Sequence, residues 1–148
     1  MHTYEVNLKW TGKTKGILSS TILPKEIEVV ALEDYHTMID GIWSPEHLLI
    51  AKINSCLMST FLTIAENSKL DFLSYESKSI CSVEIIQAKY FLIEIVLKPK
   101  VVITCSQNLE RVKQILEMSK NVCLISNAIK TPIRFDPEII VSKIQLSF

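Results

Sequence analysis

The residues of this sequence with the greatest potential for chemistry are its four cysteines, Cys56, Cys81, Cys105 and Cys123. A cysteine thiolate is a nucleophile, and two thiols that meet in space can be oxidised together to a disulfide. No two of these cysteines form a Cys-x-x-Cys pair, and the three histidines lie outside zinc-ligand spacing. We therefore expect neither a metal site nor a cofactor.

Two of the cysteines have similar surroundings. The stretch "NSCLMSTF" around Cys56 and the stretch "NVCLISNA" around Cys123 both place the thiol among small polar residues. Cysteine is among the most buried residue types and often only fills space in a core, so packing and reaction both remain open at Cys56. Cys123 falls at a predicted helical break, where a thiol can be approached. Cys81 and Cys105 fall in strand patterns, and we expect both to be buried spectators.

The composition is that of a folded protein of ordinary size. The chain has 148 residues, which predicts a single domain over 1–148 whose core needs no disulfides. Apolar residues make up 48% and charged residues 22%, which is typical of a globular protein. Sixteen basic and sixteen acidic residues leave no net charge to steer the protein to nucleic acid or anionic lipid. We therefore expect no nucleic-acid partner.

The N-terminus and the longest apolar stretch bear on where the protein works. The start, "MHTYEVNLKW", has neither the charged nor the apolar region of a signal peptide. The apolar stretch around Cys56 is interrupted by Lys52, Asn54 and Ser55, which favours a buried helix over a membrane span. We expect a cytoplasmic protein without a membrane partner, in which the cysteines are thiols.

A long predicted helix positions Cys56. Ser44 has the residue type of an N-cap, Pro45 suits the first helical position, and Glu46 suits the positive end of the helix dipole. Apolar residues then recur at spacings of three and four as far as about Asn67. Because the opposite face is also largely apolar, we expect this helix to be buried on several sides, in the centre of a domain or between two subunits.

The remaining segments surround this helix with strands. The first thirty residues contain three short strands, "TYEVNLKW", "GILSSTI" and "EIEVVA", which predict an antiparallel meander. A hairpin over 69–86 and 89–105, a helix over 106–129 and a last strand over 133–148 follow. This order predicts an α+β fold with an antiparallel β-sheet and a long central buried helix. One apolar helix of this length needs more cover than so small a sheet provides, which favours a homodimer.

Three motifs resemble the OsmC/Ohr family, the osmotically inducible and organic hydroperoxide resistance proteins: "WSPEHLLIAKINSCLMSTF", "ENSKLDFLSYES" and "NVCLISNAIK". The resemblance extends over nearly the whole chain. It implies an OsmC-like fold, an intertwined homodimer with active sites at the subunit interface, and a thiol-dependent peroxidase. Cys56 would be the peroxidatic and Cys123 the resolving cysteine, joined by a disulfide after one turnover. The resemblance also implies organic hydroperoxides as substrates, a lipoyl-type dithiol as reductant, and a role in oxidative stress.

The family also uses a glutamate of the "PE" motif and an arginine from the N-terminal sheet. Glu46 matches the glutamate. On a continuous helix it lies about 15 Å from Cys56, at ~1.5 Å per residue, so the resemblance implies that the second subunit contributes it. No arginine precedes Arg111, and the corresponding turn, "TGKTKG", offers only Lys13 and Lys15. Lysine supplies a point charge without the planar fork of arginine, so this replacement is not conservative.

Two functions remain open. The leading hypothesis is a cytoplasmic, homodimeric thiol peroxidase that acts on organic hydroperoxides. The alternative is a non-catalytic OsmC-like protein that binds a small apolar ligand in the interface pocket or senses redox state through the same thiols. A purely structural interaction module is disfavoured, because it gives no reason for two cysteines in matching motifs.

Overall fold

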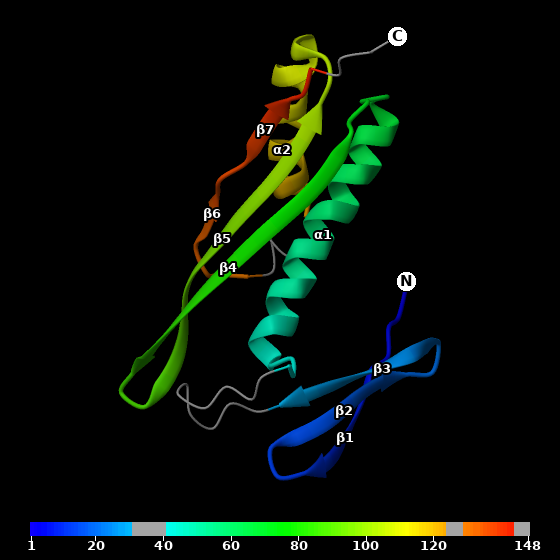
Figure 1. Cartoon of the computed structure of the whole chain (residues 1–148). Coiled ribbons are helices and arrows are strands. Elements are labelled where there is room, and N and C mark those ends of the chain that lie inside the picture. Colours follow the sequence, from blue (N-terminus) through cyan, green and yellow to red (C-terminus); the bar gives the residue numbers. More distant parts are fainter. Residues whose placement is uncertain (31–40, 124–128, 144–148) are drawn as a thin grey trace. The chain divides into compact units, whose positions relative to one another are not determined.

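The structure is a computed structural model that describes residues 1–30, 41–123 and 129–143. Contacts within the chain divide it into two compact units, Met1–Leu49 and Ile50–Phe148. The boundary between the units falls inside the first helix. Figure 1 shows the elements of both units, and we describe each unit by itself.

The first unit contains a three-stranded antiparallel sheet with the order β1-β2-β3. Its strands are β1 (Asn7–Gly12), β2 (Lys15–Ser20) and β3 (Leu23–Val30). Consecutive strands pair with each other, which confirms the predicted meander. The β1–β2 turn holds Lys13 at a φ of 49°, a region that most non-glycine residues avoid. The indole N–H of Trp10 donates to the Lys13 carbonyl at 2.9 Å and helps to hold this turn.

Helix α1 (Pro45–Asn67) has the bounds that the sequence predicts. The Ser44 Oγ accepts the backbone N–H of His47 at 3.2 Å, and the Ser44 backbone N–H donates to His47 Nδ1 at 3.2 Å. These reciprocal bonds have the geometry of a capping box, with histidine at the third helical position where glutamate is usual. Ser44 is buried. The cap therefore fixes where the helix begins and places Glu46 in its first turn.

The second unit contains a four-stranded mixed sheet. Its strands are β4 (Ser74–Ile86), β5 (Lys89–Ile103), β6 (Ile133–Phe135) and β7 (Glu138–Val141). Strands β4 and β5 form the predicted antiparallel hairpin, whereas β6 and β7 both pair with β5 in parallel. The predicted α+β class is confirmed, but this sheet is not antiparallel throughout and the predicted last strand is divided in two.

The helix between β5 and β6 explains the parallel pairing. Helix α2 (Leu109–Val122), preceded by a short 3-10 helix at Ser106–Asn108, carries the chain back along the sheet. The next strand can then run in the same direction as β5. The predicted helix extended to residue 129, but α2 ends at Val122, and residues 124–128 lie outside the described part of the chain. Cys123 is the C-cap, in agreement with its predicted place at or just past the helix end.

Both helices of the second unit pack on the same face of its sheet. One core cluster contains fully buried residues of α1, β5 and α2, namely Phe61, Val101, Ile103, Val112 and Leu116. The ring of Phe61 stacks on the ring of Tyr75 from β4, with 5.0 Å between the centroids. Since Val101 and Ile103 are two residues apart on one strand, they point to the same side of the sheet. Each helix is thereby held against the sheet and against the other helix.

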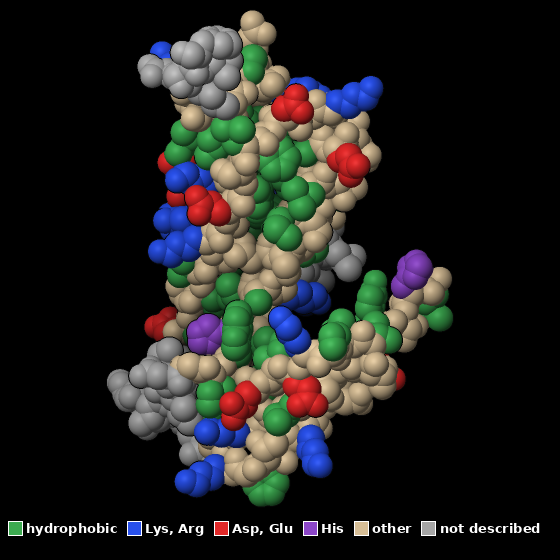
Figure 2. Space-filling model, turned by 45° about the vertical axis from the view of Figure 1, so that its right-hand side comes forward, with side chains coloured by type: hydrophobic (Ala, Val, Ile, Leu, Met, Phe, Trp, Pro, Cys, Tyr) green, Lys and Arg blue, Asp and Glu red, His purple; other side chains and the backbone are tan. Residues whose placement is uncertain are grey.

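The outer surface of α1 is only partly covered within the second unit. The buried residues of the helix form one stripe: Ile53, Leu57, Phe61 and Ala65. Outside this stripe, Met58 and Leu62 are 39% and 40% exposed, and Figure 2 shows apolar side chains gathered on the face turned to the viewer. By length and composition alone α1 is apolar enough to cross a membrane, a test that core helices of soluble proteins also pass. Here the buried stripe packs into the core of the unit.

Candidate thiol site

Cys56 and Cys123 lie in contact, although 67 positions separate them in the sequence. The Cys123 thiol donates to the Cys56 sulfur, with an Sγ–Sγ distance of 3.0 Å. A disulfide bond is about 2.05 Å long, so the two sulfurs touch without being bonded. Only a short movement is therefore needed to bring the two sulfurs to disulfide distance.

The fold of the second unit accounts for this contact. Cys56 lies near the middle of α1, one position before the buried Leu57. Cys123 follows the last turn of α2, and its backbone N–H donates to the Ser119 carbonyl at 3.0 Å. Because α1 and α2 pack together around Phe61, the end of α2 meets the middle of α1. The core packing thus fixes the place of each sulfur.

The two thiols differ in exposure. Cys123 is 3% exposed, whereas Cys56 is partly exposed. Of the two residues, Cys56 is therefore the more accessible to solvent. The Thr60 hydroxyl donates to the Cys56 carbonyl at 2.9 Å, a bond along the helix that leaves the Cys56 side chain available to Cys123.

A row of buried hydroxyls on β4 faces α1. Tyr75, Ser77 and Ser79 alternate along the strand, so their side chains point to one side of the sheet. The Asn54 amide nitrogen donates to the Ser77 carbonyl at 3.1 Å, which brings this row against the helix. Within the described part of the chain, the Ser79 hydroxyl oxygen and the Asn54 carbonyl oxygen are buried without a hydrogen-bond partner. These unpaired groups set the row apart from an ordinary apolar core.

The phenol of Tyr75 on β4 has a raised pKa. Burial raises the pKa of Tyr75 to about 12, and the charge of an ionised Cys123 acts in the same direction. A hydrogen bond with the Ser77 side chain acts in the opposite direction and lowers the pKa of Tyr75. Tyr75 is therefore neutral at neutral pH. Sequence reasoning did not single out this residue. The stretch "YESKS" could have indicated it, because a hydroxyl residue occupies every second position and these positions share one face of the strand.

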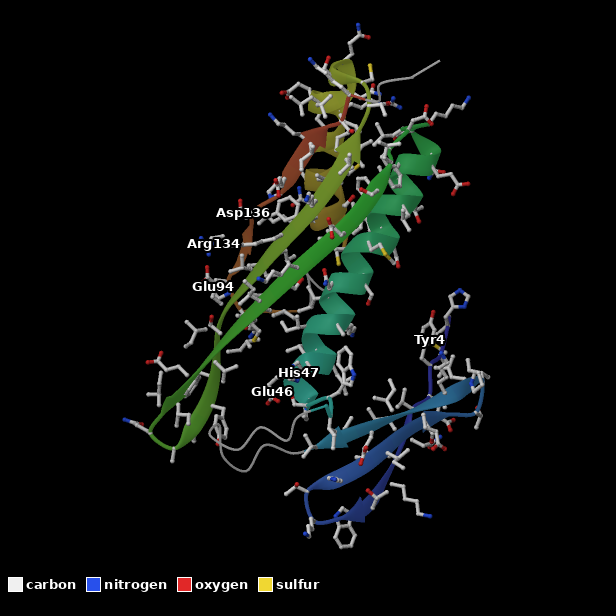
Figure 3. All side chains as sticks on the ribbon, in the orientation of Figure 1. Tyr4, Glu46, His47, Glu94, Arg134 and Asp136 are labelled. Carbon is white, nitrogen blue, oxygen red and sulfur yellow. The ribbon has the colours of Figure 1, made fainter. Side chains whose placement is uncertain are left out.

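Glu46 is placed by the helix cap. It lies beside His47 in the first turn of α1 (Figure 3). Its Oε2 atom is buried and has no hydrogen-bond partner among the described residues. A buried carboxylate oxygen without a donor is unfavourable, so Glu46 requires a donor from beyond its own turn. Because α1 is continuous, Glu46 and Cys56 are separated along one helix, as predicted.

The candidate cations Lys13 and Lys15 both belong to the first unit. Lys13 is exposed in the β1–β2 turn, and Lys15 begins β2 and is half-buried. In the second unit, the Arg134 guanidinium pairs with Glu94 at 3.2 Å (Figure 3). Arg134 precedes Phe135 on β6, and Phe135 packs on the core, so Arg134 points to the opposite face of the sheet. Arg134 is thus engaged on the face away from both helices.

The other two cysteines differ from the prediction. Cys105 is exposed because β5 ends at Ile103, before the strand pattern of the sequence stops. Cys81 is half-buried on β4. The prediction that both are buried is therefore wrong, most clearly for Cys105. Among the described residues, no three histidine, cysteine, aspartate or glutamate side chains come together as metal ligands would.

The fold and the site define a class of protein: an α+β protein in which two helices on one sheet face bring two thiols into contact. The family described as OsmC-like protein matches residues 39–138 of the chain. The chain belongs to this family, as its motifs predicted. None of the curated proteins compared with the chain matches it.

Several solved structures share the fold. The chain is similar to an OsmC-like protein of unknown function from Vibrio cholerae, with a TM-score of 0.79 and 19% identity over 93% of this chain and 99% of that one. It is also similar to an organic hydroperoxide resistance protein from Elizabethkingia anophelis, with a TM-score of 0.73 and 20% identity over 95% and 99% of the two chains. For the organic hydroperoxide resistance protein OhrB of Bacillus subtilis, the TM-score is 0.66 and the identity 15%, over 93% and 98%. At these identities the likeness establishes the fold.

Diamide, a thiol oxidant that is not a peroxide, tests the sulfur contact. It takes two electrons and two protons from a pair of thiols, and the Cys56 and Cys123 sulfurs already touch. We expect a Cys56–Cys123 disulfide within one chain as the first product, measured by mass spectrometry of an unreduced digest. Serine at either position should abolish it, and Cys105→Ser, a control at an exposed thiol, should not. A first product that contains Cys105, or that joins two chains, would contradict the contact.

Proposed function

We propose that the protein is a thiol-dependent peroxidase that reduces organic hydroperoxides, with Cys56 as the peroxidatic and Cys123 as the resolving cysteine. The observation that carries the proposal is the pair itself, two sulfurs 3.0 Å apart of which Cys56 is the more exposed. Membership of the OsmC-like family and similarity to organic hydroperoxide resistance proteins support a peroxide-related redox function.

The proposed reaction has two chemical steps. The Cys56 thiolate attacks one oxygen of the hydroperoxide, the O–O bond breaks, and the leaving alkoxide takes a proton and departs as an alcohol. Cys56 is then a sulfenic acid. The Cys123 thiolate attacks this sulfur, a disulfide forms, and the displaced hydroxide takes a proton and leaves as water. The sulfur contact favours the second step, because the sulfenic acid is captured before more peroxide reaches it.

In this proposal a dithiol of the lipoyl type restores the reduced pair. It supplies two electrons and two protons, and it ends as the disulfide itself. Disulfide exchange requires that a reductant sulfur reach one sulfur of the pair, and the partial exposure of Cys56 provides this access. We place this cycle in the cytoplasm, where thiols are kept reduced.

Glu46 and one of Lys13 or Lys15 complete the proposed site. A cation beside Cys56 would favour the thiolate and would polarise the peroxide, the task of the family's arginine. The Glu46 Oε2 atom, which is buried without a partner among the described residues, supports this arrangement, since an ammonium group would supply a donor. In the proposal the second subunit brings these groups to the thiol pair.

We further propose a homodimer with one OsmC-like domain per chain. The family match over 39–138 crosses the boundary between the two compact units, which supports a single domain. The partial exposure of Met58 and Leu62 on α1 supports burial of this surface against a second copy. Neither nucleic acid nor a membrane is a partner in this proposal.

One observation favours the alternative of a redox sensor or a ligand-binding relative. The sequence has no arginine before Arg111, and Arg134 pairs with Glu94 on the other face of the sheet. Lysine lacks the fork that holds a carboxylate and a peroxide together, which favours slow oxidation of Cys56. A sensor requires reversible disulfide formation without fast turnover, and the sulfur contact serves that purpose equally well.

Sedimentation velocity tests the assembly. We expect twice the 16.8 kDa mass of the chain, because a large exposed apolar surface is unfavourable in a soluble monomer. The double variant Met58→Glu/Leu62→Glu should shift the mass towards that of one chain, since it places charges in the proposed interface. Lys98→Glu, a charge change at an exposed strand position, is the control and should remain a dimer. A folded wild-type monomer at every concentration would exclude the interface.

Substitution of the two lysines tests the proposed cation. Alanine at the lysine that serves the site should slow Cys56 oxidation by cumene hydroperoxide about tenfold, the effect of a change of about one pKa unit in the thiol. Arginine at the same position should preserve or raise the rate. Stopped-flow measurement with one equivalent of peroxide gives the rate, and Lys9→Ala on β1 is the control. If neither Lys13→Ala nor Lys15→Ala changes it, another group stabilises the thiolate.

Turnover with cumene hydroperoxide and a dithiol, compared with hydrogen peroxide, tests the function. Cys56→Ser should abolish turnover, because a neutral hydroxyl is not a competent nucleophile without a base. Cys123→Ser should allow one oxidation and then accumulate sulfinic acid on Cys56, visible by mass spectrometry. Cys105→Ser should retain turnover. If all four thiols survive stoichiometric organic hydroperoxide, the peroxidase proposal fails and the ligand-binding alternative replaces it.

A further inference from the structure

The side chain of His47 closes the cap at the start of α1. The Ser44 Oγ accepts the His47 backbone N–H at 3.2 Å, and the Ser44 backbone N–H donates to His47 Nδ1 at 3.2 Å. A backbone N–H can only donate, so Nδ1 must be an acceptor and the proton of the neutral ring must lie on Nε2. The Ser44 Oγ lies 2.6 Å from the same Nδ1, so the hydroxyl donates to it as well. The cap thereby selects one tautomer of His47.

The segment before the helix is anchored to the sheet of the first unit. The Val30 backbone N–H donates to the Trp43 carbonyl at 3.0 Å, and Trp43 forms a parallel bridge with Val29 of β3. The Trp43 ring meets the His47 ring edge-on, with 6.1 Å between the centroids. Ser44 is only 1% exposed, so water has little access to its backbone N–H. This N–H therefore depends on His47 Nδ1 as its acceptor.

Protonation of His47 breaks one half of this cap. The residue is exposed, so its ring can take up a proton from solvent. An imidazolium carries a proton on both nitrogens, so Nδ1 then donates to the Ser44 Oγ and no longer accepts the Ser44 N–H. The buried N–H loses its partner, and a positive charge is placed at the positive end of the helix dipole. The cap is therefore complete at high pH and is lost as pH falls through the range in which histidine titrates.

The charged groups on the elements around the cap are Glu46, Lys15 and Glu28. Glu46 lies in the same turn as His47, Lys15 lies on β2 opposite the last residue of β3, and Glu28 is exposed on β3. Among the described residues, none of the three forms an ion pair with the His47 ring. Water and salt screen charges that are not in contact at an exposed helix end. The hydrogen bonds of the cap therefore determine which form of the ring the helix start favours.

We propose that His47 is a positioning residue, which holds Glu46 in place through the cap when its ring is neutral and releases it when the ring is protonated. Glu46 precedes His47 in the first turn, and Figure 3 shows both residues at the start of α1. The first turn of a helix lacks partners for its N–H groups, so without its cap it frays and Glu46 loses its fixed direction. The inference rests on Glu46 as part of the proposed site. Oxidation of Cys56 should then fall in acid by more than thiol titration alone explains.

The variant His47→Gln tests this positioning, because glutamine is a usual partner of serine in a capping box and does not titrate. Stopped flow with cumene hydroperoxide gives the rate of Cys56 oxidation from about pH 8 to about pH 5. The ratio of the His47→Gln rate to the wild-type rate removes the titration of Cys56 itself. This ratio should be close to unity at the alkaline end and rise several-fold towards the acid end. His47→Ala, which has no acceptor, should be slow at every pH, and the exposed control His2→Gln should follow the wild type.

A double-mutant cycle tests whether His47 acts through Glu46. In a Glu46→Gln background, His47→Gln should no longer change the dependence of the rate on pH, because the carboxylate that the cap holds is gone. A ratio that still rises in this background overturns the inference. So does a ratio that stays flat when Glu46 is present.

NMR of the reduced, isotope-labelled protein separates this inference from the peroxidase proposal. At about pH 8 the His47 ring should show the Nε2–H tautomer. The Ser44 amide proton and the Glu46 carboxyl carbon should shift together with the His47 ring as pH falls, and neither should show that midpoint in His47→Gln. A proton on Nδ1 of the neutral ring, or a Ser44 amide and Glu46 carboxyl that do not follow the ring, overturns the inference. These titrations need no peroxide, so coupled shifts in a protein without peroxidase activity support the positioning of Glu46 and reject only the peroxidase.

Discussion

The packing of α1 and α2 on one face of the same sheet is the constraint on which the thiol site depends. No covalent bond holds the Cys56 and Cys123 sulfurs at 3.0 Å. Their separation is set by the close-packed core around Phe61, which contacts the sheet and is surrounded by residues of both helices. Protein cores have the packing density of organic crystals, so they restrict how far two helices packed in one core can shift relative to each other. The distance between the Cys56 and Cys123 sulfurs is therefore set by apolar residues that take no part in the chemistry.

The C-terminal strands extend this constraint to the end of α2. Strands β6 and β7 pair with β5 in parallel. This pairing requires that the segment between β5 and β6, which contains α2, return along the sheet before β6 begins. Phe135, Ile139 and Val141 from these strands pack against the same cluster as Phe61. Cys123 follows the last turn of that crossover helix, so the short parallel strands hold its thiol indirectly. This explains why a segment without candidate chemistry is needed for the site.

The sequence predicted local features better than contacts between elements. The Ser44 cap and Pro45 gave the start of α1, and alternation gave the meander and the β4–β5 hairpin, because each signal lies within a few neighbouring residues. The parallel pairing of β6 and β7 was not predicted, since strand direction depends on how a distant helix crosses. The spacing of apolar residues indicated which side of α1 carries Cys56. It could not indicate that the end of α2 lies against that side. That contact was expected only from the family resemblance.

The two steps of the proposed reaction, oxidation of Cys56 and disulfide formation with Cys123, depend on residues from different parts of the chain. Oxidation of Cys56 needs a cation and Glu46, and both lysine candidates and Glu46 belong to the first compact unit. In this proposal, resolution needs only the two thiols of the second unit. The lack of an arginine before Arg111 then slows the first half of the proposed reaction and leaves the second half intact. Slow oxidation of Cys56 would in this way turn the proposed peroxidase into a redox sensor, without any change in the core that brings the two sulfurs together.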